Sequence, residues 1–220
     1  MMLNQGDQVC NDPNSCSYNI DTWKGSGNTP VNAPWGTIGL TQGSGFIDVK
    51  ILMNSGNALL GNTGAGDAFL FDLTKTLTAA NITANATDGL GNSQAFALDK
   101  VPAGHQDGTG DWTYGIFCSS CNGGSQVWTE LDVKISLAGI KLADFVANDL
   151  GNSFAADICV GTSVSGGKLT CGGRPGVTGD AVVTQGGTPV PEPVSLSLFG
   201  VGLIAMGALG RRRRKTASKV

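Results

Sequence analysis

The sequence predicts a mainly β protein, with an antiparallel β-sandwich or jelly-roll-like body and a single C-terminal transmembrane helix. Three features support this: many glycines with few charges, segments of alternating polarity, and one apolar run near the C-terminus. The 220 residues include 34 glycines and only 14% charged residues, which is typical of short strands joined by many turns. The hydrophobic content of 40% is enough for a core, which argues against general disorder.

Local composition divides the chain into four parts. Residues 1–34 are rich in Asn, Gly, Pro and Ser and predict an irregular N-terminal arm that contains two cysteines. Residues 35–164 predict the sandwich body. Residues 165–189 are rich in Gly, Thr and Pro and predict a linker, and residues 190–215 predict a membrane-sorting tail.

Alternation with a period of two residues predicts the strands of the body. One face of such a strand is buried and the other is exposed to water, as in antiparallel sheets. The alternating segments are 45–53, 69–73, 112–118, 131–137 and 154–160, and residues 95–98 add a shorter strand. Turn residues separate these segments. The only helix predicted in the body is Leu142–Leu150, ended by Gly151.

The formal charge is divided unequally between body and tail. Of the 14 basic and 17 acidic residues, six basic and one acidic lie after residue 188, so the body has 8 basic and 16 acidic residues. An acidic body is a poor partner for nucleic acid. Divalent cations or polar polysaccharide suit it better, although solubility alone also explains this charge.

Six cysteines form three local pairs along the chain. An even number in an exported protein predicts disulfide bonds, although the sequence does not select one of the alternative connectivities. Nearest neighbours are the expected partners: Cys10 with Cys16, Cys118 with Cys121, and Cys159 with Cys171. The spacing of Cys118 and Cys121 also occurs in redox and zinc sites. The Asn122-Gly123-Gly124 segment opposes the helix of a redox site, so a structural disulfide is expected.

Catalytic chemistry finds little support in the sequence. His105 is the only histidine, it lies in a turn-rich segment, and there is no G-x-S-x-G nucleophile elbow. A paired-carboxylate hydrolase needs two acids across a cleft, whereas Glu130 and Asp132 are expected on the exposed face of one strand. We therefore expect a protein that is not an enzyme, and a hydrolase built around His105 is the second alternative.

The first alternative function is a carbohydrate-binding module, with or without dependence on calcium. Asp107 and Asp111 place two carboxylates in a glycine-rich loop, and calcium takes 6–8 oxygen ligands. The loop lacks the third acid and the closing glutamate of an EF-hand. Trp112 and Trp128 would stack on sugars if they were exposed, although alternation favours burial of Trp112. No cofactor other than calcium is suggested.

The C-terminal residues have the physical properties of a membrane signal. The uncharged run Val194–Gly210 has 17 residues and would extend roughly 25 Å as a helix, slightly less than a bilayer core of about 30 Å. It ends at the basic cluster Arg211, Arg212, Arg213 and Arg214, which should stay on the cytoplasmic side. Pro191 and Pro193 flank Glu192 and keep the chain before the run extended, so a processing enzyme can bind it.

This combination of motif, apolar run and basic stop resembles the PEP-CTERM sorting domain of Gram-negative bacteria. The resemblance covers roughly residues 189–215 and implies that exosortase, a membrane protease or transpeptidase, recognises Pro191, Glu192 and Pro193 and cuts nearby. It also implies transfer to the cell surface or to extracellular polysaccharide. The alternative is an ordinary tail anchor with a polar spacer.

An exported protein of this kind should begin with a secretory signal. Met1–Asp7 contain neither a basic segment nor an apolar one, so we expect that the true start lies upstream. The body would then cross the inner membrane and reach the surface or the extracellular matrix. The expected function is structural or adhesive, in an exopolysaccharide or biofilm matrix, with exosortase and polysaccharide as partners.

Overall fold

The computed structural model describes residues 8–24, 29–30, 32–61, 67–106, 108–121, 126–172 and 177–184. All of them belong to one compact unit, residues 1–186. Among these described residues, no helix is long and apolar enough to cross a membrane. The predicted transmembrane segment, Val194–Gly210, lies outside them.

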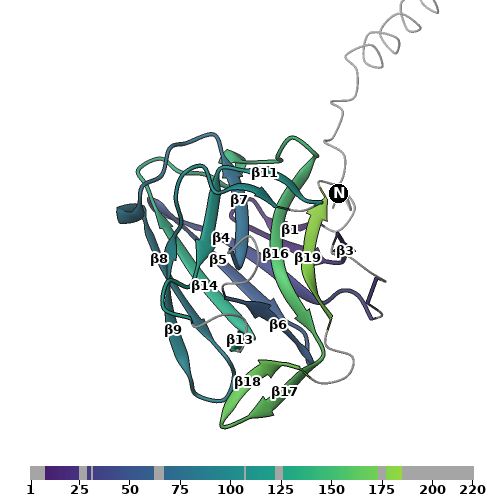
Figure 1. Ribbon diagram of the computed structural model, residues 1–220. Helices are drawn as coiled ribbons and strands as arrows, with labels where there is room; N and C mark the ends of the chain where they lie inside the picture. Colours follow the sequence, from purple (N-terminus) through teal and green to yellow (C-terminus); the bar gives the residue numbers. More distant parts are fainter. Residues whose placement is uncertain are drawn as a thin grey trace, which may run out of the picture. The chain divides into compact units, whose positions relative to one another are not determined.

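The described residues form a 15-stranded sheet and two separate hairpins, with every strand pair antiparallel (Figure 1). The first layer of the sheet contains, in spatial order, β1 (Gln8–Asp12), β2 (Ser15–Ile20), β4 (Gly36–Gly43), β5 (Phe46–Met53), β14 (Glu130–Ser136), β8 (Ile82–Thr87) and β9 (Ser93–Leu98). The second layer contains β12 (Tyr114–Phe117), β7 (Phe69–Leu73), β16 (Asn152–Val160), β19 (Val177–Thr184) and β3 (Thr22–Trp23).

Shorter elements complete the second layer and its surroundings. They are β6 (Asn57–Leu60), β13 (Val127–Trp128) and β15 (Phe145–Val146), the hairpins β10 (Gly104–Gln106) with β11 (Gly110–Trp112) and β17 (Thr162–Ser165) with β18 (Lys168–Cys171), and the 3-10 turns Ala79–Asn81 and Leu142–Asp144. The predicted mainly antiparallel β fold is therefore confirmed.

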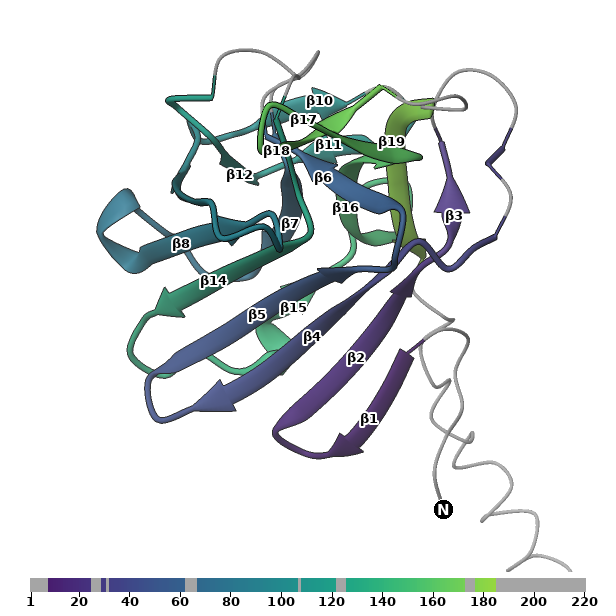
Figure 2. The same ribbon diagram turned by 90° about the horizontal axis from the view of Figure 1, so that it is seen from below.

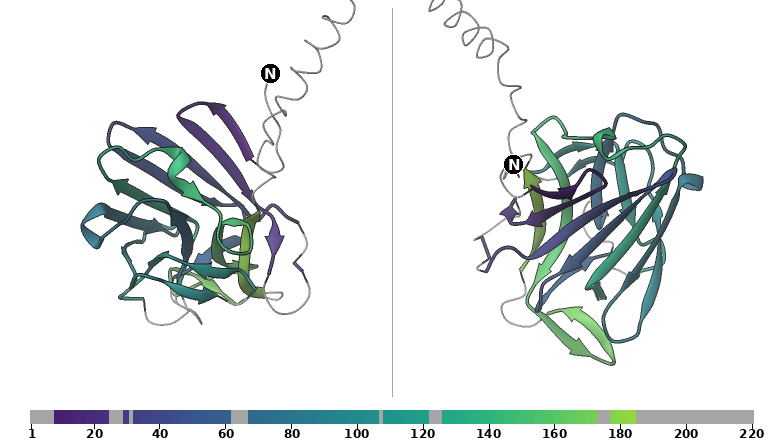
Figure 3. Two further views of the ribbon diagram at one scale, coloured as in Figure 1. Left: turned by 90° about the horizontal axis from the view of Figure 1, so that it is seen from above. Right: turned by 180° about the vertical axis from the view of Figure 1, so that it is seen from behind.

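The two layers face each other and are joined by continuous pairing. Strand β9 pairs with β8 of the first layer and with β12 of the second, so the sheet folds over without a break. Figure 2 shows β1, β2, β4, β5, β14 and β8 side by side, with the second layer behind them. In the right view of Figure 3, the purple and blue strands of the first layer lie in front of the green strands of the second.

Alternation in the first layer follows the sequence prediction. The inner residues of β5 are Ile47, Val49 and Ile51, and they pair directly with Ile135, Val133 and Leu131 of β14. All six are buried, whereas the residues between them face solvent. This arrangement places the charged residues of β5 and β14 on the exposed face of the first layer.

Strands of the second layer are buried on both faces, which differs from the alternation expected for residues 69–73 and 154–160. Eight of the nine residues of β16 are buried. Its inner face joins the main core through Phe154, Ala156 and Ile158. On the outer face, Ala155 packs with Leu70, Trp112 and Val182, and Cys159 packs with a cluster that includes Leu169 of β18. The hairpins thus cover the outer face of β16, which was expected to be exposed to solvent.

Aromatic rings connect the two layers. Phe154 of β16 lies 5.1 Å from Tyr18 of β2, measured between ring centroids, in an edge-to-face arrangement. It also stacks on Phe69 at 5.8 Å. Such pairs add about 0.5–1.5 kcal/mol beyond the burial of their area. They hold the N-terminal strands against the second layer.

Two of the four predicted segments contain strands that composition did not predict. Residues 1–34 are not simply an irregular arm, because β2 pairs with β4 along its whole length, from Ser15–Thr41 to Ile20–Gly36. The predicted linker, 165–189, contains β18 and β19 instead. Strand β19 pairs with β16 from Val160 to Asn152. Sheet pairing supplied by distant strands outweighs the local preference of Gly and Thr for loops.

The helix predicted at Leu142–Leu150 is also wrong. Only Leu142–Asp144 forms a 3-10 turn, and β15 follows it immediately. The Asp144 carboxylate accepts hydrogen bonds from the Lys141 N–H at 2.8 Å and the Thr74 hydroxyl at 3.0 Å. The bond from Lys141 caps this single turn. The helix does not continue because Phe145 pairs with Leu73 of β7 and packs against Phe71 and Phe154. The predicted strand 112–118 is similarly divided at Thr113, between β11 and β12.

Three disulfides join the neighbouring cysteines: Cys10–Cys16, Cys118–Cys121 and Cys159–Cys171. This agrees with the nearest-neighbour pairing expected from the sequence. The described residues contain no free cysteine. The first bridge joins the two strands of the N-terminal hairpin, and the second closes the turn after β12. The third connects the end of β16 to β18.

Loss of the bridge with the longest loop should have the largest effect on stability among the three. Replacement of both Cys159 and Cys171 by alanine opens a sequence separation of 12 residues, and loop entropy then predicts a loss of about 3 kcal/mol. The same change at Cys118 and Cys121, only three residues apart, should cost about 2 kcal/mol. Urea denaturation of both variants tests this order, and a larger loss at Cys118 and Cys121 would contradict it.

Candidate functional site

Several predicted site residues lie outside the part of the chain that the structure describes. These are the sorting residues Pro191, Glu192 and Pro193, the basic cluster Arg211 to Arg214, and Asp107. Their roles remain predictions from sequence.

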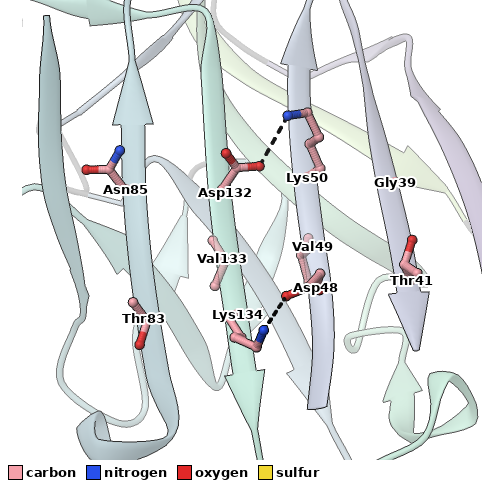
Figure 4. Close-up of a pocket in the computed structure, with 10 residues that line it drawn as sticks. All are labelled: Gly39, Thr41, Asp48, Val49, Lys50, Thr83, Asn85, Asp132, Val133 and Lys134. Carbon is pink, nitrogen blue, oxygen red and sulfur yellow. Dashed lines mark ion pairs between the residues drawn. The ribbon is translucent and has the colours of Figure 1, made fainter. Parts of the chain in front are cut away.

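A groove crosses the exposed face of β4, β5, β14 and β8 (Figure 4). Its volume is about 620 Å³. Because the four strands pair in register, its side chains form two rows across the sheet. One row is Gly39, Lys50, Asp132 and Asn85, and the other is Thr41, Asp48, Lys134 and Thr83. The register of distant strands therefore assembles this surface.

Opposite charges pair across the two central strands of the groove. Lys50 contacts Asp132 at 3.5 Å, and Lys134 contacts Asp48 at 3.5 Å. Lys134 also lies over the Phe46 ring, with its Nζ 3.8 Å from the centroid. Cross-strand pairs of this kind stabilise a sheet modestly. The four charged residues that line the groove balance each other.

Glu130, one row further along β14, forms a hydrogen-bonded ion pair with Lys50. That hydrogen bond lowers the pKa of the Glu130 carboxyl and raises the pKa of Lys50. Burial is the main cause that raises the pKa of Asp132. Both acids lie on one strand and both contact the same lysine. They form a surface charge cluster, as the sequence suggested, rather than two acids facing each other across a cleft.

His105 and Asp111 lie opposite each other on the β10–β11 hairpin. The His105 Nδ1 lies 2.9 Å from Asp111 Oδ1, and the two side chains are 63% and 71% exposed. The Asp111 N–H donates to the Asp149 carboxylate at 3.0 Å. The exposed histidine agrees with the sequence analysis. No group of three potential metal-ligating side chains occurs within the described ranges.

The two tryptophans considered for sugar stacking are buried. Trp112 packs under the β10–β11 hairpin and donates its Nε1–H to the Thr109 hydroxyl at 3.0 Å. Trp128 lies in the main core, edge-to-face with Phe96. Neither ring can stack on a ligand at the surface, so stacking by these tryptophans is ruled out. Burial of Trp112 was the outcome that alternation favoured.

Asp67 is a buried carboxylate that the sequence analysis did not single out. It is only 2% exposed, and its Oδ1 has no hydrogen-bond partner among the described residues. Its carboxyl group packs so closely on Gly115 that a β-carbon there would lie 2.4 Å from Cγ. Burial, and secondarily the nearby charge of Asp99, raise the pKa of Asp67 to about 7.

The groove was missed because it is not a local pattern. Strands β4 and β8 were not predicted, and the rows depend on which residues lie opposite each other in the sheet. A usable signal was present at Gly39, a glycine between the apolar residues Ile38 and Leu40. Glycine inside a strand marks a bulge or a close approach of another chain.

Comparison with known proteins identifies one region of the chain. The family model of the PEP-CTERM protein-sorting motif matches residues 189–215. None of the curated proteins and none of the solved structures matches the chain. The motif indicates an exported protein that passes through the membrane, is processed by exosortase and is sorted to the cell surface. The chain therefore carries a PEP-CTERM protein-sorting motif at residues 189–215.

Proposed function

We propose that this protein is a non-catalytic structural or adhesive component of an extracellular polysaccharide matrix. The sorting motif at residues 189–215 carries the proposal, because it directs the body to the cell surface, where exopolysaccharide is the surrounding material. The tail holds the protein in the membrane until exosortase frees or transfers it.

Properties of the body support this proposal. Its three disulfides suit an oxidising, extracellular environment. The middle strands of the first layer expose charged side chains, and the two carboxylates of β14 are engaged by Lys50 rather than set across a cleft. An exposed sheet face with paired charges suits a protein that contacts a hydrated polymer.

Fractionation of a biofilm tests the proposal. The chain, with an epitope tag inserted after Gly166 in the exposed β17–β18 turn, is produced with a working signal peptide in cells that have exosortase. Cells, extracted matrix and medium are then separated. We expect most of the protein in the matrix fraction, and its release when the polysaccharide is enzymatically degraded.

A matched control removes sorting without touching the body. A chain that ends at Thr184, the last residue of β19, should be secreted into the medium if the tail directs it to the matrix. Full-length protein that stays with the cell membrane, or that enters the medium free of polysaccharide, would contradict a matrix function.

A further inference from the structure

The middle of β4 contains a glycine that the backbone does not require. Gly39 is an interior residue of an eight-residue strand and lies on the face opposite the buried Ile38 and Leu40. It is not among the glycines with positive φ. A β-carbon added there would meet only the Lys50 carbonyl oxygen, at 3.8 Å, which is an ordinary contact. Glycine weakens a strand, so folding alone favours a side chain here.

The missing side chain keeps the groove open. Gly39 lies at one side of the groove, in the row that continues through Lys50, Asp132 and Asn85, and Ser17 of β2 pairs with it on the other side. Strands lie about 4.8 Å apart, so a row across four strands is about 15 Å long, enough to hold a few sugar rings. A larger residue at position 39 would occupy one end of this row.

The polar groups of the groove suit a neutral ligand with many hydroxyl groups. Thr41, Thr83 and Asn85 are exposed, and their side chains form no hydrogen bond with any residue that the structure describes. The charged groups between them are already paired, because Lys134 contacts Asp48, and Lys50 contacts both Asp132 and the adjacent Glu130. A polyanion would meet carboxylates that outnumber the lysines, and a polycation would meet two lysines, whereas a neutral chain avoids both conflicts.

We propose that this groove binds a neutral polysaccharide strand, with Gly39 providing the space and Asn85, Thr41 and Thr83 the hydrogen bonds. The inference rests on the proposed matrix function and names the surface through which the body contacts the polymer. Binding at one groove is weak, and many copies in a matrix strengthen it through multivalency.

Affinity electrophoresis of the full chain in mild detergent tests the groove. Native gels contain hydroxyethyl cellulose, dextran, or neutral polysaccharide extracted from the matrix of the producing cells. Parallel gels contain alginate, a polyanion, or chitosan, a polycation. Gly39→Thr fills the groove with a residue that favours strands, and Gly172→Thr is the matched control, because a β-carbon at that exposed glycine meets nothing within 4 Å. Thermal unfolding verifies that both variants fold.

We expect at least one neutral polysaccharide to retard the unmodified chain and Gly172→Thr equally, and at least a tenfold loss of affinity (about 1.4 kcal/mol) in Gly39→Thr. Asn85→Ala should also weaken binding, and it provides the test of the groove if Gly39→Thr does not fold. Equal retardation of all the variants, no retardation by any neutral polysaccharide, or retardation only by alginate or chitosan would overturn the inference.

Self-association that Gly39→Thr abolishes would also overturn it, because a second copy of the chain would then occupy the groove. These failures are distinct from failure of the proposed function. If the unmodified protein stays in the matrix fraction while Gly39→Thr binds polysaccharide normally, the proposed matrix function stands and only the groove is excluded as the binding site.

Discussion

Replacement of Pro191, Glu192 and Pro193 together by alanine is expected to abolish processing of the tail. In cells with exosortase, the unmodified chain should yield a product that ends near these residues, whereas the variant should keep Arg211–Arg214. The physical reason is that proline disfavours helix at the residue before it, so alanines would remove the predicted extended segment, and would also remove the one charge that a protease can recognise. Intact mass spectrometry of the surface and membrane fractions measures both products.

Two controls separate recognition of the motif from other effects on the tail. Lys219→Ala changes a charge beyond the matched residues 189–215 and should be processed normally. Cells without exosortase should keep the full-length chain in every case. If the unmodified chain keeps its basic cluster even when the enzyme is present, the tail is a plain membrane anchor.

Replacement of Asp67 by asparagine is expected to change how stability depends on pH. In the folded protein the pKa of Asp67 is raised from 3.8 to about 7, mainly by burial. Below its ordinary pKa the carboxyl is protonated in both states and has no effect. Between about pH 4 and 7 the folded state keeps a proton that the unfolded chain releases, so the free energy of unfolding falls as pH rises.

The size of this effect follows from the shift in pKa. One unit corresponds to about 1.4 kcal/mol, so the carboxylate destabilises the fold by up to about 4 kcal/mol above pH 7. An asparagine side chain at this position would have a similar shape and no charge. We expect Asp67→Asn to equal the unmodified protein near pH 4 and to be more stable by a few kcal/mol at pH 8, as measured by urea denaturation.

Asp99 provides a second variant for the same experiment. Its charge is the second cause of the raised pKa of Asp67, so Asp99→Asn should lower that pKa and make the loss of stability between pH 4 and 8 smaller. If the stability curves of Asp67→Asn and the unmodified protein run parallel over this range, Asp67 does not carry the pH dependence.

Alternation predicted β5 and β14 of the first layer well, because the pattern of apolar and polar residues lies within each strand. Residues 45–53 and 131–137 became β5 and β14, with the expected apolar residues inside. Alternation was wrong for the face of β16 that it predicted to be exposed, because Trp112 and the hairpins cover that face. It also missed β2 and β4, whose polar residues, and in β4 the interior Gly39, form strands because neighbouring strands supply the pairing.

The sequence by itself determined the sorting motif and the mainly β class of the body, and it favoured the nearest-neighbour pairing of cysteines that the structure then selected. Each depends on residues that are close together in the chain, such as the motif at residues 189–215. Only the tertiary structure decided the limits of the body, the burial of Asp67 and the groove around Gly39. Those depend on the register and packing of strands far apart in sequence, such as β4 with β5 and β14 with β8, which no local pattern specifies.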